Sequence, residues 1–190
     1  MGRQLIVSSS FDLRTVNAAN VMTALRVVLV PIIIVLLLVG GDAAQWWALA
    51  LFVIASFTDT ADGWLARRHE RVTRWGKLAD PAADKVLVLG VLAALVWRGD
   101  IAWWVLAIIA VREIAITVQR QVLLRQDLVM SASVWGKTKT VSQLIAISLV
   151  IAPFIPRGLG LAAIYIAVLL TVGSGLDYAI RGARRLREAS

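Results

Sequence analysis

Six apolar segments, separated by polar or glycine-containing turns, constrain the fold of this 190-residue chain more than any other feature. They cover residues 21–39, 46–65, 86–97, 101–118, 141–153 and 159–178. A helix needs roughly 20 residues to cross a bilayer, and the third and fifth segments reach that length only by extending through polar residues, from about Leu78 and Gly136. Hydrophobic residues form 59% of the chain, against roughly 45–50% in soluble domains. The sequence therefore predicts an all-α integral membrane protein with six transmembrane helices in one domain, residues 1–190.

The distribution of basic residues predicts how these helices are oriented. The expected turns on one side are residues 40–45, 98–100 and 153–158. They hold only Arg98 and Arg157 of the 20 lysines and arginines. Because basic residues accumulate on the cytoplasmic side, both termini are predicted to be cytosolic, as an N-terminal segment 1–20 and a basic tail 181–190. Tryptophans flank the outer turns, as expected of an aromatic belt: Trp46, Trp47, Trp103 and Trp104.

The net charge of +8 is explained by this topology, so we expect no nucleic-acid partner. The basic tail is expected to rest on anionic membrane lipid. The first residues lack the pattern of a cleaved secretory signal, so the first segment is expected to be a permanent span of a multi-pass protein of the cell membrane. No cysteine occurs, which excludes disulfides and a cysteine nucleophile.

Four aspartates lie at the predicted cytosolic ends of the second and third helices. Asp59 and Asp62 are three residues apart, and Asp80 and Asp84 are four apart, so each pair shares a helix face. The short connection between the helices allows the two pairs to face each other. Two carboxylates about 4 Å apart repel by about 4 kcal/mol at an effective dielectric of 20, so a positive group is expected among them.

Two kinds of positive group could stabilise these carboxylates. Arg67 and Lys85 could form a structural ion-pair cluster with them. A divalent cation fits better, since an all-carboxylate set suits Mg²⁺ or Mn²⁺, whereas zinc prefers cysteine or histidine and the single His69 is expected at the surface. Two such ions could clamp a diphosphate and orient an in-line displacement. Gly63 would let a phosphate approach the helix backbone, or, with Ala66, would permit close helix packing.

The spacing of these residues resembles the signature of the CDP-alcohol phosphotransferase family at every defined position: Asp59-x2-Asp62-Gly63-x2-Ala66-Arg67-x8-Gly76-x3-Asp80-x3-Asp84. The resemblance implies the fold of that family, with six membrane helices, cytosolic termini and an active site facing the cytosol, and it implies a homodimer. It also implies that two Mg²⁺ ions, or Mn²⁺, are bound by the four aspartates: Asp59, Asp62, Asp80 and Asp84.

The same resemblance implies further roles and a reaction. Asp84 would also be the general base that takes the proton of the acceptor hydroxyl. Contacts to the CDP moiety are implied for Gly63, Arg67 and Thr73, and for Thr23 in the first helix. The reaction would be attack of an alcohol on the lipid-side phosphorus of CDP-diacylglycerol with release of CMP. The chain is therefore expected to be a transferase of phospholipid biosynthesis.

Four basic residues at the cytosolic ends of the fourth and fifth helices bear on the acceptor: Arg112, Arg120, Lys137 and Lys139. The elements 112–114, 136–140 and 20–26 resemble the subgroup that uses glycerol 3-phosphate, although Ala19 and Trp75 depart from its usual residues. Fixed positive charge would hold the phosphate of that acceptor, while the positive-inside rule alone would also explain each residue. Two residues two apart cannot share a helix face, so at least one of the two lysines is expected in a loop.

Other activities stay open at this point. Within the family, the acceptor could be phosphatidylglycerol, giving cardiolipin, or inositol phosphate. Outside it, a membrane transporter could place cation-binding carboxylates in its helices, but here the aspartates gather at one surface and the outer halves of the helices are almost free of polar residues. A membrane prenyltransferase also uses aspartates and Mg²⁺ on a diphosphate, usually from widely separated helices. Release of CMP would distinguish a phosphotransferase from both.

Overall fold

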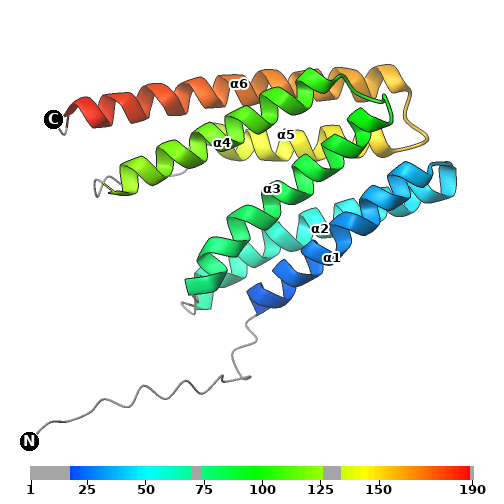
Figure 1. The fold of residues 1–190 in the computed structure, drawn as a ribbon, viewed down its shortest axis with the longest axis horizontal. Coiled ribbons are helices and arrows are strands. Elements are labelled where there is room, and N and C mark those ends of the chain that lie inside the picture. Colours follow the sequence, from blue (N-terminus) through cyan, green and yellow to red (C-terminus); the bar gives the residue numbers. More distant parts are fainter. Residues whose placement is uncertain (1–17, 70–73, 126–133, 189–190) are drawn as a thin grey trace, which may run out of the picture.

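The computed structural model describes the backbone of residues 18–69, 74–125 and 134–188, and the side chains of residues 25–58, 85–123 and 135–185. Within these ranges the secondary structure consists of six helices joined by turns, with no strand, which confirms the all-α prediction (Figure 1). The helices are α1 (Ala18–Val39), α2 (Asp42–His69), α3 (Arg74–Trp97), α4 (Trp103–Arg125), α5 (Val134–Ile151) and α6 (Arg157–Glu188).

The helix boundaries follow the apolar segments at one end and extend beyond them at the other. Helices α3 and α5 begin at Arg74 and Val134, so both short apolar segments extend through polar residues as predicted. Because α5 begins at Val134, Lys137 and Lys139 both lie in the helix, and the expectation that one of them lies in a loop is wrong. Helix α6 continues to Glu188, so most of the predicted basic tail is helical.

Glycines form the turns at the end of the bundle that is predicted to lie outside. Gly40 and Gly41 connect α1 to α2 with φ of 75° and 84°, and Gly99 follows α3 with φ of 76°. Only glycine adopts this backbone region without steric cost, which allows such abrupt reversals. The α1–α2, α3–α4 and α5–α6 turns all lie at the same end of the bundle, on the right of Figure 1. This is the alternation expected of helices that cross a layer in turn.

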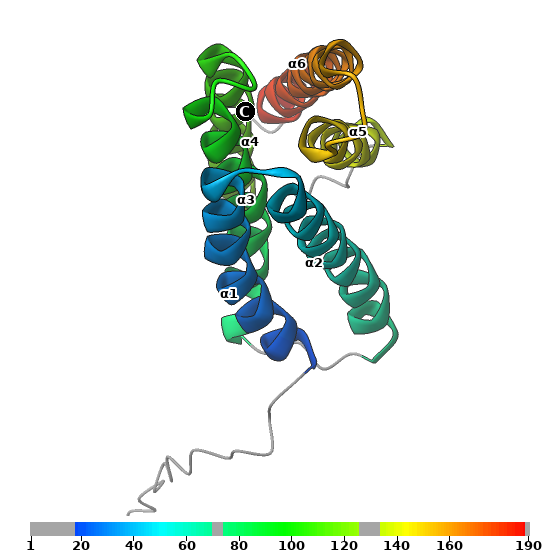
Figure 2. The same cartoon turned by 90° about the vertical axis from the view of Figure 1, so that its right-hand side faces the viewer.

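The six helices pack around one apolar core. Helix α1 packs against α2 and α3, while α6 packs against α4 and α5. Contacts of α2 with α5 and of α3 with α4 join these two groups (Figure 2). The core contains fully buried side chains from several helices, including Ile33, Phe52, Leu92, Ile109 and Ile147. The fold therefore holds the polar ends of α2 and α3 on the same body as the basic residues of α4 and α5.

Many large apolar side chains point outward from this bundle. Val35 of α1, Val111 of α4 and Leu169 of α6 are each more than half exposed. Soluble monomers rarely expose large contiguous apolar surface. By length and apolarity together, the residues 157–185 of α6 form the one candidate membrane span found among the described residues.

Candidate functional site

The four predicted metal ligands lie on two helices that meet at one end of the bundle. Asp59 and Asp62 lie in α2, and Asp80 and Asp84 lie in α3. Only residues 70–73 separate the two helices, so both pairs lie in the halves of α2 and α3 that are nearer this connection and away from the glycine turns (Figure 1). The side chains of all four lie outside the described ones. Among the described residues no group of three or more potential metal ligands occurs.

The predicted contacts to the CDP moiety fall in the same part of the chain. Thr23 lies in α1, and Gly63 and Arg67 lie in α2, with their surroundings outside the described residues; Thr73 lies between the described ranges. Their roles stay predictions. The described side chains begin again at Lys85, one residue after Asp84, and from there a polar cluster can be followed across α4, α5 and α6.

A single carboxylate, that of Glu113 in α4, lies at the centre of this cluster. Its Oε1 accepts a hydrogen bond from Nη1 of Arg112 at 3.1 Å and is ion-paired with Nζ of Lys139 in α5. The side chains of Arg112, Glu113 and Lys139 are only 14%, 15% and 6% exposed, respectively. We refer to Lys85, Arg112, Glu113, Thr117 and Lys139 as the Glu113 cluster.

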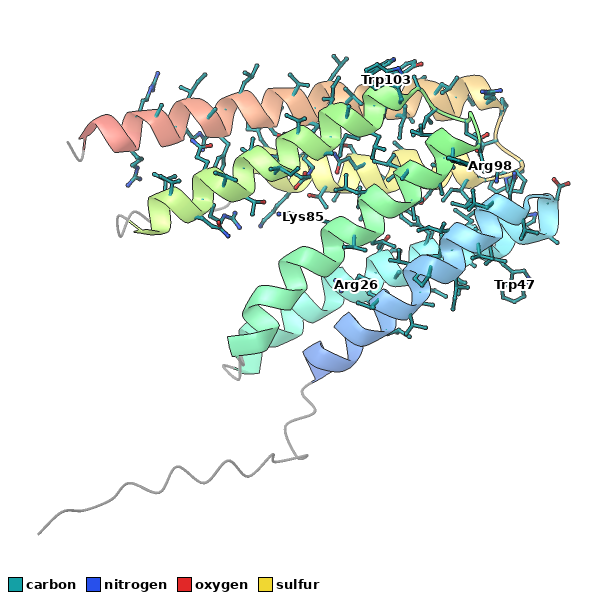
Figure 3. The ribbon with its side chains drawn as sticks, in the orientation of Figure 1. Arg26, Trp47, Lys85, Arg98 and Trp103 are labelled. Atoms are coloured by element: carbon teal, nitrogen blue, oxygen red, sulfur yellow. The ribbon has the colours of Figure 1, made fainter. Side chains whose placement is uncertain are left out.

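Lys85 connects this cluster to the helix of the predicted general base. Its Nζ donates a hydrogen bond to Oγ1 of Thr117 in α4, and Figure 3 shows Lys85 beside that helix. The Thr117 hydroxyl in turn donates to the backbone oxygen of Glu113 at 2.6 Å. Lys85 was expected to be a possible partner of the aspartates, and the structure places its ammonium group against α4. The residue after Asp84 therefore contributes a third cation to the cluster.

Helix α6 supports Arg112 from the other side. Nη2 of Arg112 donates to Oγ of Ser174 at 3.1 Å, and the Ser174 hydroxyl donates to the backbone oxygen of Thr171 at 2.9 Å. The next residue, Gly175, lies directly under the arginine, since a Cβ there would be 3.1 Å from Cγ of Arg112. Thr171 also accepts a hydrogen bond of 2.8 Å from Nε2 of Gln143 in α5. Arg112 is thus fixed between α4 and α6.

The structure divides the four predicted acceptor residues into two kinds. Arg112 and Lys139 are brought together by Glu113, and both are shielded from solvent, with Lys139 buried. Arg120 of α4 and Lys137 of α5 are exposed. Lys137 and Lys139 therefore face different sides of α5, which confirms that they do not share a face.

Sequence reasoning missed Glu113, Ser174, Gly175 and Thr117 as parts of this site. A signal for Glu113 was present, because an acidic residue inside an apolar helix is costly unless it is paired. Nothing comparable marks Ser174 or Gly175, since small residues are frequent wherever membrane helices pack closely.

The Glu113 cluster gathers positive charge among the described side chains. Three cationic side chains, Lys85, Arg112 and Lys139, accompany one carboxylate, in a setting largely shielded from solvent. Cationic side chains gathered in a partly buried setting favour an anion beside them. Guanidinium and ammonium groups are the usual partners of phosphate. The cluster is therefore chemically suited to bind a phosphate beside α3.

Comparison with known proteins agrees with this chemistry. Residues 16–173 match the profile of the CDP-alcohol phosphatidyltransferase family. A protein of Mycobacterium tuberculosis named "Probable phosphatidylglycerophosphate synthase" is 41% identical over 177 residues, covering 90% of this chain and 84% of the relative. A Bacillus subtilis protein named "CDP-diacylglycerol--glycerol-3-phosphate 3-phosphatidyltransferase" is 37% identical over 179 residues, covering 85% of this chain and 93% of the relative.

A Rickettsia bellii protein with the same name as the Bacillus relative is 32% identical over 168 residues, covering 85% of this chain and 93% of the relative. The chain belongs to the CDP-alcohol phosphatidyltransferase family. The family resemblance drawn from the aspartate spacing is thereby confirmed.

Proposed function

We propose that this protein transfers the phosphatidyl group of CDP-diacylglycerol to glycerol 3-phosphate, which yields phosphatidylglycerophosphate and CMP. The names of its relatives support this activity. The observation that carries the choice of acceptor is the gathering of three cationic side chains around Glu113, which begins one residue after Asp84. An acceptor with its own phosphate offers these cations an anionic partner, whereas an uncharged alcohol does not.

Each residue of the site then has a definite task. The acceptor phosphate is held by Arg112 and Lys139, which places the glycerol hydroxyl toward the end of α3. Asp84 takes the proton of that hydroxyl as its oxygen bonds to the lipid-side phosphorus, and the bond from that phosphorus to the oxygen of CMP breaks. Thr23, Gly63, Arg67 and Thr73 contact the CDP moiety, while Arg120 and Lys137 add positive charge at the entrance for the acceptor.

The donor set of the site fits Mg²⁺, which takes carboxylate oxygens and substrate phosphates as ligands. We propose that Asp59, Asp62, Asp80 and Asp84 bind two such ions, with Mn²⁺ as a possible substitute. Both aspartate pairs lie in the connected halves of α2 and α3, which supports a common site. When bound, the ions would neutralise the diphosphate and stabilise the charge that develops on it.

We also propose that all six helices cross the cell membrane, with both termini and the site on the cytosolic side. The shortest helix, α5, has 18 residues and is about 27 Å long at 1.5 Å per residue. This length approaches the roughly 30 Å of a hydrocarbon core. The outward apolar side chains and the common end of the glycine turns support this topology. A homodimer is part of the proposal through the family resemblance alone.

The deciding experiment follows CMP release by the purified protein with Mg²⁺ and CDP-diacylglycerol. Glycerol 3-phosphate, inositol phosphate and phosphatidylglycerol are offered separately. We expect release with glycerol 3-phosphate alone, and none after addition of a chelator. CMP release with only one of the other acceptors would overturn the proposed choice of acceptor. No CMP release with any of them would overturn the proposed activity. Phosphatidylglycerol as sole acceptor would indicate cardiolipin synthesis.

A further inference from the structure

Glu113 is a carboxylate at the place where the proposed acceptor binds its own negative phosphate. Taken alone, its charge weakens the attraction for a phosphate, because it neutralises one of the three cations around it. A cluster that served only to attract anions would be stronger without it. The position of Glu113 therefore needs a physical reason other than attraction of the phosphate.

The contacts of Glu113 supply that reason. One carboxylate oxygen contacts both Arg112, its neighbour in α4, and Lys139, which comes from α5. Arginine and lysine side chains are long and lose much rotamer freedom when they are ordered. Two adjacent cations also repel each other and would separate without a shared anion. Glu113 therefore orders both side chains at the α4–α5 interface before any ligand arrives.

Helix α6 completes this arrangement without contributing a predicted site residue. Ser174 accepts a hydrogen bond of 3.1 Å from Nη2 of Arg112, and Gly175 leaves room for the arginine to lie on the helix. With these bonds made, Nε of Arg112 still has no hydrogen-bond partner among the described residues. A buried donor without a partner is costly, and a ligand oxygen would relieve that cost.

We propose that Glu113 is a positioning residue of the acceptor site, which holds Arg112 and Lys139 in the geometry that binds the acceptor phosphate. Ser174 and Gly175 of α6 form the surface on which Arg112 packs. This inference rests on the proposed function. A carboxylate that merely linked α4 to α5 would affect both substrates alike. A positioning residue affects the substrate held by the side chains that it orders.

The first test is Glu113→Gln, which keeps the size of the side chain and removes its charge. We expect the KM for glycerol 3-phosphate to rise about tenfold, equivalent to about 1.4 kcal/mol, while the KM for CDP-diacylglycerol changes less than about twofold. In an Arg112→Ala/Lys139→Ala background the same substitution should have no further effect, because the groups through which it acts are gone. Equal changes of both KM values, or an undiminished effect in that background, would overturn the proposal.

The control for Glu113→Gln is Asp100→Asn. Asp100 is also paired with an arginine, Arg98, at 2.9 Å, but it lies at the opposite end of the bundle. Its substitution should leave both KM values unchanged. An equal rise of the acceptor KM in this variant would show that the loss of any arginine–carboxylate pair has the effect.

A second variant moves Arg112 while it keeps every charge. In Gly175→Ala the new Cβ would be 3.1 Å from Cγ of Arg112, so the arginine must shift by a few tenths of an ångström. We expect a rise of about threefold in the KM for glycerol 3-phosphate only. The matched control is Gly173→Ala on the same helix, where a Cβ meets nothing within 4 Å. An unchanged KM in Gly175→Ala would remove α6 from the proposal.

A third measurement needs no activity. Lys139 is buried and Lys137 is exposed, so an amine-reactive reagent followed by mass spectrometry should label Lys137 faster in the parent protein. In Glu113→Gln the labelling of Lys139 relative to Lys137 should rise at least about threefold. An unchanged ratio would contradict the ordering of Lys139 by Glu113, even if the parent protein used a different acceptor. Failure of the proposed acceptor would instead show as no CMP release with glycerol 3-phosphate by the parent protein.

Discussion

Two clusters in this bundle each pair an arginine with a carboxylate, but the two clusters have different roles. In the Arg98 cluster, formed by Arg98, Asp100 and Arg157, Nε of Arg98 pairs with Asp100 at 2.9 Å. The remaining bonds go to backbone oxygens: Nη1 of Arg98 to Leu37 at 2.9 Å, and Nη2 of Arg157 to Gly99 at 2.7 Å. In the Glu113 cluster, the cations contact side chains instead, namely Glu113 and Thr117 of α4 and Ser174 of α6.

The difference lies in what the positive charge contacts. Leu37 is near the C-terminus of α1, where helix carbonyls have no partner within the helix, so Arg98 closes a helix end. The Arg98 cluster thus stabilises turns. The Glu113 cluster closes no helix end and concentrates charge beside the predicted catalytic helix. A pocket beside the glycine turns is lined by Arg98, Asp100 and Arg157, yet these side chains already bind one another or the backbone, so we assign it no substrate.

The largest expected effect is on kcat, and it distinguishes Asp84 from Asp100 beside the glycine turns. Asp84→Asn should lower kcat for CMP release by at least about a thousandfold, within the range known for loss of a general base. Some binding of CDP-diacylglycerol should remain, because the other aspartates are intact. Asp100→Asn at the outer end should keep kcat within about twofold. Full activity of Asp84→Asn would remove that residue from the mechanism.

The next effect is on the KM for glycerol 3-phosphate, and it distinguishes Arg112 from Arg98. Arg112→Ala removes charged hydrogen bonds of about 1.5–3 kcal/mol each, so we expect the KM for glycerol 3-phosphate to rise about 10- to 100-fold. The KM for CDP-diacylglycerol should change much less. Steady-state kinetics with each substrate varied in turn measures both values. Equal rises for both substrates would show that Arg112 supports only the fold.

The sequence predicted the helices and the helix faces of the basic residues better than it predicted the partners of those residues. Apolar segments and glycine turns predicted six helices, and the positions of Lys137 and Lys139 predicted that they face different sides of α5. These are local properties, which depend on periodicity and turn residues alone. The position of both lysines within α5 was missed because polar residues continue a helix as readily as they begin a loop when the helix packs against neighbours.

The partners of the basic residues could not be predicted. Arg98 and Arg112 have similar sequence surroundings, each within two residues of an acidic residue and at the end of an apolar run or within one. Their roles differ because Arg98 meets the end of α1 and Arg112 meets Ser174 of α6, which are distant in sequence. Such pairings depend on how the helices pack, and a single sequence does not contain that information directly.

A third effect concerns stability at the outer end. Arg98→Ala removes the ion pair with Asp100 and the bond to the Leu37 carbonyl, so the free energy of unfolding should fall by about 1–3 kcal/mol. Both KM values should stay unchanged, because no substrate is bound there. Thermal unfolding in detergent, alongside the kinetic assay, measures both quantities. A selective loss of affinity for glycerol 3-phosphate in this variant would contradict the division between the two clusters.

The smallest effect separates two lysines of one helix. Lys137 is exposed, so its interaction with an incoming phosphate is weakened by water and salt, and Lys137→Ala should raise the KM for glycerol 3-phosphate only about twofold at low ionic strength. The effect should fade as salt is added. Lys139→Ala should raise the same KM by tenfold or more, about 1.4 kcal/mol, with little dependence on salt, because Lys139 is buried against Glu113. A larger effect at Lys137 than at Lys139 would place the phosphate on the exposed side of α5, away from the Glu113 cluster.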